Sequence, residues 1–272
     1  MTYTTYKDYI EYLPGCLLEN LDNNRLIFTV TTGRSGTGYL AKMLDKIPEV
    51  AAFHEPHPKF SDFLREVQKD SDIALHFWIL RKLPSIAQTP ENIYIETSHL
   101  FGKGFLESLI GIGIIPDIII LKRDFRKVAS SLYELNVIPG RTQEGLKFLL
   151  HPDDPEVIPV NNWENLNDYQ LCYWYCLEME RRMKKYTKLI TELGGKVIQS
   201  RNIFYKDNLT KLLKQLDLEK YQSLLEDEYF QQSHQKVNTK DNLKRRNVHS
   251  DFENLDKLEE QVLGMLAEHV EC

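Results

Sequence analysis

Residues 26–38 read LIFTVTTGRSGTG and carry the clearest indication of fold class in the chain. The first part, Leu26–Thr31, is apolar and β-branched, which predicts a strand buried on both faces of a sheet. The second part places three glycines among side chains that can donate hydrogen bonds. Apolar residues then recur at helical spacing over Tyr39–Ile47. A buried strand that leads through a glycine-rich loop into a helix is typical of sites that bind a phosphate-like anion.

Strands and helices alternate along the rest of the chain. Further apolar runs predict strands at Val50–Phe53, Ile93–Thr97, Asp117–Leu121 and Lys196–Ser200. Helical patterns lie between them, at about 60–83, Gly104–Ile112, Lys127–Leu135 and Tyr169–Leu193, the last followed by a Gly-Gly pair suited to a helix end. This alternation predicts an α/β fold with a doubly wound, mainly parallel sheet flanked by helices, in which ligands bind at the carboxyl ends of the strands.

A chain of 272 residues without repeats or linkers predicts a single domain spanning residues 1–272. Within it, residues 136–165 contain four prolines and form a segment too long for a plain connection. We expect this segment to be a lid or loop insertion over the acceptor, together with the helices of residues 59–90, because loops beyond the strand ends usually set specificity.

Composition disfavours several classes of protein. With 42% hydrophobic and 27% charged residues, the chain is neither disordered nor fibrous. Its net charge of −6 argues against bulk binding to nucleic acid or to an anionic membrane, which needs a basic surface. The longest apolar run, Leu109–Leu121, contains Pro116 and Asp117 and is too short to span a bilayer. The first residues include acidic side chains and lack the apolar core of a signal peptide, so we expect a cytoplasmic protein.

The cysteines and aromatic residues are expected to be structural. Cys16, Cys172, Cys176 and Cys272 fit no disulfide framework and no zinc-binding spacing. Cys172 and Cys176 lie one helical turn apart in an aromatic run, where buried thiols are expected. The aromatic side chains of that run recur at helical spacing, which is more typical of a core than of an adenine- or acceptor-binding platform.

The loop of residues 33–38 can bind an anion through its backbone. Glycines permit a tight turn on which successive N–H groups converge, and the following helix adds the positive end of its dipole. Arg34, Ser35 and Thr37 add side-chain donors. The spacing is not that of a Walker A loop, since no Gly-Lys-Ser/Thr follows, and the G-x-G-x-x-G dinucleotide fingerprint also fails. An ATPase or dehydrogenase is therefore disfavoured, while a P-loop small-molecule kinase and a non-catalytic nucleotide-binding module stay open as alternatives.

Two stretches carry a resemblance to a known family. Residues 32–44, TGRSGTGYLAKML, resemble the 5′-phosphosulfate-binding loop of the sulfotransferase superfamily. Residues 121–135, LKRDFRKVASSLYEL, are similar to its 3′-phosphate motif, in which an arginine at a strand end is followed eight residues later by a serine. Arg123 and Ser131 hold these positions, and Phe125 stands where the family often has proline. The planar fork of an arginine suits a phosphate, and a serine two helical turns further on can face the same group.

The resemblance implies a P-loop-like fold and a sulfotransferase that uses 3′-phosphoadenosine 5′-phosphosulfate (PAPS) as donor, without a metal. It implies donor binding by Gly33, Arg34, Ser35, Gly36, Thr37, Gly38, Arg123 and Ser131. A basic segment at residues 236–246 is similar to the family's C-terminal basic loop and adds Lys240 and Arg245. The acceptor stays open as a small molecule, a carbohydrate or a peptide, and no nucleic-acid partner is expected.

Two residues compete for the role of general base. Sulfuryl transfer is an in-line displacement that needs positive charge beside the sulfate, which Arg34 can supply, and a base for the acceptor hydroxyl. Glu55, in AAFHEPHP (51–58), resembles the Glu-Pro of carbohydrate and protein-tyrosine sulfotransferases, whose acidic residue is the base. His99, in YIETSHLF (94–101), resembles the Thr-His-Leu-Pro of cytosolic sulfotransferases, whose histidine is the base. We favour Glu55, with His99 as alternative or helper and Glu96 as a residue that orients one of them.

A metal site at this position is not expected. His54 and His57 flank Glu55, but the sequence H-E-P-H lacks the helical spacing of the H-E-x-x-H zinc motif and contains a proline. The segment around His99 also departs from its family pattern, because Phe101 takes the place of the proline.

Overall fold

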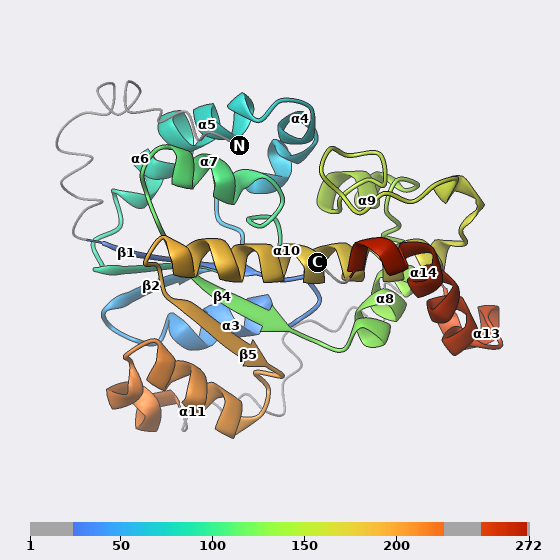
Figure 1. The fold of residues 1–272 in the computed structure, drawn as a ribbon. Coiled ribbons are helices and arrows are strands. Elements are labelled where there is room, and N and C mark those ends of the chain that lie inside the picture. The colour runs from blue at the N-terminus through green and yellow to red at the C-terminus, as the bar shows by residue number, and fades with distance from the viewer. Residues whose placement is uncertain (1–23, 226–245, 271–272) are drawn as a thin grey trace.

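The computed structural model describes residues 24–225 and 246–270 (Figure 1). Its centre is a five-stranded sheet in the order β2-β3-β1-β4-β5, in which every neighbouring pair is parallel. The strands are β1 (Arg25–Val30), β2 (Val50–Phe53), β3 (Ile93–Glu96), β4 (Asp117–Lys122) and β5 (Val197–Arg201). The five predicted strands are confirmed, with each end within one residue of its expected position.

Helices cover both faces of the sheet (Figure 1). One face carries α4 (Leu64–Lys69), α5 (Asp72–Phe77), α6 (Leu83–Ile86), α7 (Phe105–Gly111) and α10 (Asp168–Glu192), with α8 (Phe125–Glu134) packed on α10. The other face carries α3 (Thr37–Leu44) and α11 (Lys206–Gln215). The remaining described elements are α9 (Gln143–Phe148), α13 (Val248–Asp251), α14 (Leu255–Val270) and the short turns η1 (Phe60–Asp62), η2 (Trp78–Lys82), η3 (Trp163–Asn165) and η4 (Glu219–Tyr221). A parallel sheet between two helical layers is consistent with the predicted doubly wound fold.

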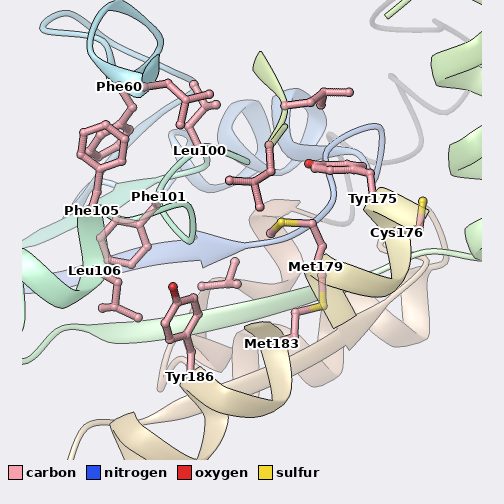
Figure 2. Close-up of a cluster of buried hydrophobic side chains, with 14 of the residues drawn as sticks. Phe60, Leu100, Phe101, Phe105, Leu106, Tyr175, Cys176, Met179, Met183 and Tyr186 are labelled. Atoms are coloured by element: carbon pink, nitrogen blue, oxygen red, sulfur yellow. The ribbon is translucent and has the colours of Figure 1, made fainter. Parts of the chain in front are cut away.

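The central strand β1 is buried on both faces, as its composition predicts. Phe28 and Val30 belong to the hydrophobic cluster on the α10 side, and Ile27 belongs to the cluster on the α3 side. Phe28 stacks on Phe101 at 4.4 Å between ring centroids. Figure 2 shows the α10 side, where that helix contributes side chains including Met179 and Tyr186. Each large apolar side chain buried in this way contributes about 1.5–3 kcal/mol, so the two clusters hold the strand ends firmly.

The helix α10 has the ends that its sequence predicts. Asn167 caps the first turn and Gln170 completes a capping box, while Gly194 beyond the last turn has φ +84°. Cys172 and Cys176 are free and buried in this helix, as expected, and burial raises the pKa of both thiols. Cys16 and Cys272 lie outside the described residues.

Two segments differ in detail from the sequence prediction. The helical stretch predicted over 60–83 is divided, because Asp70 is extended (φ −147°, ψ 109°) between α4 and α5, and the π-helical turn η2 follows. The segment 136–165 contains a helix of its own, α9. Thr142 caps the start of α9, because its side-chain hydroxyl accepts a hydrogen bond from the N–H of Gly145 at 3.1 Å. Residue 145 has to be glycine, since a Cβ at this position would collide with the carbonyl oxygen of Ile138. The helix α9 was not predicted, because a six-residue polar segment near prolines shows no clear helical pattern.

The order of the strands places the site. β1 leads into α3 on one face, whereas β3 and β4 lead into α7 and α8 on the other. In a parallel sheet this divergence opens a crevice at the carboxyl ends of the strands. The loops that follow β1, β2, β3 and β4 all begin at this edge. Separately, no helix in the described ranges is long and apolar enough to cross a membrane.

Candidate functional site

The loop between β1 and α3 turns through three left-handed residues. Gly33, Arg34 and Gly36 have φ values of +78°, +56° and +96°. A Cβ on Gly33 would lie 3.0 Å from Cγ of His99, and one on Gly36 would lie 2.9 Å from the ring of Phe204. Glycine is therefore required at both positions by conformation and by space. Arg34 adopts the same region with a side chain, which is uncommon and is concentrated at functional sites.

The backbone N–H groups of this loop are free to bind a ligand. Among the described residues, no hydrogen bond is donated by the N–H groups of Gly33, Arg34, Ser35 or Gly36, and α3 begins without a side-chain cap. The hydroxyl of Ser35 instead donates to the carbonyl oxygen of Gly33 at 2.9 Å, so this side chain shapes the loop from inside. Consecutive free N–H groups at an uncapped helix start form a concave anion-binding surface.

The second predicted motif meets the loop. Arg34 Nε donates to Ser131 Oγ at 3.0 Å, and an Nη of Arg123 donates to the carbonyl oxygen of Arg34. Ser131 thus contacts the loop arginine, and the two motifs join through Arg34. Burial and the nearby charge of Arg123 lower the pKa of Arg34, and burial lowers the pKa of Arg123. Two partly buried guanidinium groups held together in this way favour an anion as their partner.

Glu55 and His99 form a hydrogen-bonded pair across adjacent strands. His99 Nδ1 lies 2.9 Å from Glu55 Oε1, because β2 and β3 are in register at Phe53 and Glu96. Burial raises the pKa of Glu55, but the hydrogen bond and charge of His99, with His54 and Lys103, outweigh it and bring the pKa to about 2. Burial, followed by the charge of Lys103, lowers the pKa of His99 in spite of Glu55.

The directions of these pKa shifts favour an ionised Glu55 beside a neutral His99 at neutral pH. The carboxylate is ionised and can only accept, so Nδ1 of the neutral imidazole carries the proton that it donates to Glu55. Nε2 of His99 has no hydrogen-bond partner among the described residues and keeps its lone pair. The pair therefore has the form of a carboxylate that orients an imidazole base.

The anion loop and the Glu55–His99 pair line one cavity of about 190 Å³. Its polar lining comes from the loops after β1, β2 and β3: Thr32, Gly33, Arg34, Thr37, His54, Glu55 and His99. The remaining lining comes from α8, α9 and the residues beside them: Leu132, Leu135, Val137, Glu144, Phe148 and Leu149. The crevice predicted from the topology thus brings the sequence-predicted loop and both candidate bases together.

A second cavity of about 390 Å³ lies at the ends of β4 and β5. Its lining is mainly basic and polar: Lys122, Arg123, Asp124, Phe125, Glu180, Arg201 and Asn202. Arg123 links the two cavities, since it also contacts the anion loop. Arg201 was not predicted as a site residue, although it directly follows the predicted strand 196–200 and pairs in register with Lys122.

Glu96 acts on the site through another residue. Its carboxylate is fully buried, pairs with Lys82 Nζ at 2.7 Å and accepts from the Tyr94 hydroxyl at 2.8 Å. Lys82 Nζ also lies 3.0 Å from the carbonyl oxygen of Pro58 and 3.4 Å from that of Pro56. Lys82 therefore joins Glu96 to the backbone that carries Glu55. No hydrogen bond or ion pair links Glu96 directly to Glu55 or His99 in the described residues.

Lys103 is a second buried cation that sequence reasoning missed. Its Nζ donates to the carbonyl oxygen of Phe148 at 2.6 Å and lies 4.9 Å from the ring centroid of Tyr175. The Tyr175 hydroxyl donates to the carbonyl oxygen of Thr32 at 2.8 Å. Burial sets the pKa of Lys103 well below its ordinary value. Lys103 thus ties the 136–165 segment to the core beside the anion loop.

The remaining predicted residues lie elsewhere. Lys240 and Arg245 fall outside the described residues. Arg246 is described, and it pairs with Asp168 of α10. Gly38 lies in the first turn of α3. In the parts of the chain that the structure describes, no three His, Cys, Asp or Glu side chains are grouped to hold a metal ion.

No known protein-family model matches this chain, and no curated protein matches it either. The interpretation of the site therefore depends on its own geometry.

Proposed function

We propose that this chain is a sulfotransferase with a P-loop-like fold, which moves the sulfuryl group of PAPS to an acceptor hydroxyl. One observation carries the proposal. In the described part of the chain, a loop with four N–H groups that lack an acceptor contacts Arg123 and Ser131 through Arg34, and it shares a cavity with a histidine whose Nε2 has no partner there. Anion binding and proton acceptance thus occur side by side, as transfer to a hydroxyl requires.

The lining residues suit the shape and charge of the donor. The N–H groups of residues 33–36 and the Arg34 guanidinium would hold the phosphosulfate end. Arg123 would hold the 3′-phosphate with its planar fork. The larger cavity has room for the nucleoside, and Lys122, Arg123 and Arg201 in its lining supply positive charge for the attached 3′-phosphate. These assignments follow the order of the two sequence motifs along the chain.

The chain supplies the base and the charge stabilisation. PAPS supplies an activated sulfuryl group: the acceptor oxygen bonds to sulfur as the bond from sulfur to the phosphate oxygen breaks, and that oxygen keeps the electron pair. Nε2 of His99 takes the hydroxyl proton, and Glu55 stabilises the imidazolium through Nδ1–H. Arg34 stabilises the negative charge that grows on the phosphate oxygen as its bond to sulfur breaks. We thus assign the base to His99 and the orienting role to Glu55, in the reverse order of the sequence expectation, because a carboxylate with a pKa of about 2 is a weak base.

Ligand binding separates this function from its rivals. Adenosine 3′,5′-bisphosphate without Mg²⁺ should raise Tm, and ATP with Mg²⁺ should not. A ligand at 100 times its Kd adds about 2.7 kcal/mol to stability. Arg123→Ala should lose most of the shift. Arg81 is exposed and lines neither cavity, so Arg81→Ala should keep the full Tm shift.

The other outcomes point elsewhere. Stabilisation by ATP with Mg²⁺ alone would indicate a kinase and end the sulfotransferase proposal. Stabilisation by the bisphosphate without transfer from PAPS to any hydroxyl compound would indicate a nucleotide-binding module.

A further inference from the structure

The carbonyl groups of the anion loop are bound by side chains that lie behind the loop. Three consecutive carbonyl oxygens accept such hydrogen bonds: that of Thr32 from the Tyr175 hydroxyl at 2.8 Å, that of Gly33 from the Ser35 hydroxyl at 2.9 Å, and that of Arg34 from the Arg123 guanidinium. The carbonyl of Gly33 also accepts from the Thr32 hydroxyl at 2.8 Å. Three peptide groups of the loop are thus fixed through their oxygen atoms.

These contacts set the direction of the N–H groups. A trans peptide group is planar, so its N–H points opposite to its carbonyl. The peptide between Thr32 and Gly33 is trans, and the bond from Tyr175 therefore orients the N–H of Gly33 away from α10. The same reasoning holds for the N–H groups of Arg34 and Ser35. The loop presents these donors already oriented, which lowers the cost of binding an anion.

Tyr175 is the one side chain of this set that lies in the core. It is fully buried in the hydrophobic cluster on the α10 side of the sheet and lines neither of the two cavities (Figure 2). Burial raises the pKa of its hydroxyl, which therefore keeps its proton and can donate. Lys103 Nζ lies 4.9 Å from the centroid of the Tyr175 ring, a distance suited to a cation–π contact that holds the ring in place.

We propose that Tyr175 is a positioning residue of the anion loop, whose hydroxyl orients the N–H of Gly33 toward the bound anion. This role rests on the proposed function in one respect, because that function assigns the 5′ end of the donor to the loop. Tyr175 does not touch the ligand and acts through the peptide group that it fixes. Its loss should weaken the hold on the 5′ group and leave the contact of Arg123 with the 3′-phosphate unchanged.

One variant and two nucleotides test this role on the full chain. Tyr175→Phe removes the hydroxyl and keeps the ring, so core packing and the contact with Lys103 are preserved. We expect Kd for adenosine 3′,5′-bisphosphate to rise about three- to tenfold, as for the loss of one neutral hydrogen bond. Kd for adenosine 3′-phosphate, which lacks the 5′ group, should stay unchanged. Calorimetric titration well below Tm measures both values on folded protein.

Tyr173→Phe is the matched control. Tyr173 lies on the same helix, packs in the same hydrophobic cluster and lines neither cavity, so its loss of a hydroxyl should leave Kd for both nucleotides unchanged. A lower Tm in Tyr175→Phe with an unchanged Kd for the bisphosphate would show that the hydroxyl stabilises the fold alone, and it would overturn the proposal. An equal loss of affinity for both nucleotides would overturn it as well.

The amide signal of Gly33 separates this role from the proposed function. Inorganic sulfate, titrated into the ¹⁵N-labelled chain and followed by NMR, should shift this signal strongly in the unmodified chain and less in Tyr175→Phe. If sulfate does so and the bisphosphate does not bind, the proposed function is wrong and the role of Tyr175 stands. If the bisphosphate binds equally well to the variant and to the unmodified chain, the role of Tyr175 is wrong and the donor site stands.

Discussion

At the scale of single residues, Glu55 and His99 gain their roles from each other. The carboxylate holds Nδ1–H at 2.9 Å, which leaves Nε2 as the free lone pair in the cavity. Both residues could be predicted from the sequence, because each follows a predicted strand, and the resemblance to a Glu-Pro motif favoured Glu55 as the base. Which of the two is the base depends on which atom is free and on the pKa values that burial and the contact produce, and neither can be derived from the sequence.

The first prediction concerns substitution of this pair. His99→Ala should lower kcat by roughly 10²–10⁴-fold, because the proton acceptor is removed. Glu55→Gln should lower it by roughly tenfold or more, because the amide no longer stabilises the imidazolium. Donor affinity, measured by titration with adenosine 3′,5′-bisphosphate, should change little in either variant. If Glu55→Gln is inactive while His99→Ala keeps most of its kcat, Glu55 is the base.

The pH profile gives a second prediction. Only the neutral imidazole can accept a proton, so kcat should fall as pH decreases through the His99 pKa, which burial sets below its ordinary value of 6.5. Removing the Glu55 charge takes away a stabiliser of the imidazolium, so Glu55→Gln should move this fall to still lower pH. If Glu55 were the base, the fall would instead follow its pKa of about 2 and disappear in Glu55→Gln.

At the scale of elements, the strands could be predicted, and the supports of the loops could not. β1 and β4 are runs of apolar, β-branched residues, a pattern that specifies a buried parallel strand locally. Lys82 and Lys103 look like surface residues in sequence, yet both are buried. Their positions depend on partners that are distant in sequence, such as Glu96 and Phe148. Composition and spacing do not show such contacts.

The loop after β2 gives the prediction that belongs to this scale. Lys82→Met would leave the Glu96 carboxylate buried without its partner, so the variant should lose about 3–5 kcal/mol of stability. Adding Glu96→Gln removes that charge and keeps an acceptor for Tyr94, so Tm should partly recover. We expect kcat to be low in Lys82→Met and to stay low in the double variant, because in both the carbonyl groups of Pro56 and Pro58 lack their donor, Lys82 Nζ.

Thermal unfolding and steady-state kinetics check this prediction together. Arg81→Met, next to Lys82 but exposed, serves as the control and should change neither quantity. A double variant with full kcat would show that the buried pair stabilises the fold without positioning Glu55.

At the scale of the whole molecule, the net charge of −6 conceals a basic edge. Arg34, Lys122, Arg123 and Arg201 all lie at the carboxyl ends of the strands and line the two cavities. An acidic chain that gathers these cations at one edge can attract a highly anionic donor without binding nucleic acid in bulk. Composition alone argued against bulk binding to nucleic acid. The attraction for an anionic donor follows only from the strand order, which gathers these cations at one edge.

The last prediction follows from that charge distribution. Because the cavity at the ends of β4 and β5 is partly open to solvent, salt should screen its attraction for the donor, and Kd for adenosine 3′,5′-bisphosphate should rise several-fold between 0.05 and 0.5 M NaCl. Arg201→Gln removes one exposed cation from the lining, so it should weaken binding about two- to fivefold at low salt and reduce the dependence on salt. Arg81→Gln should do neither. Calorimetric titration at the two salt concentrations checks this, and an identical salt dependence in Arg201→Gln and the unmodified chain would show that the donor does not reach Arg201.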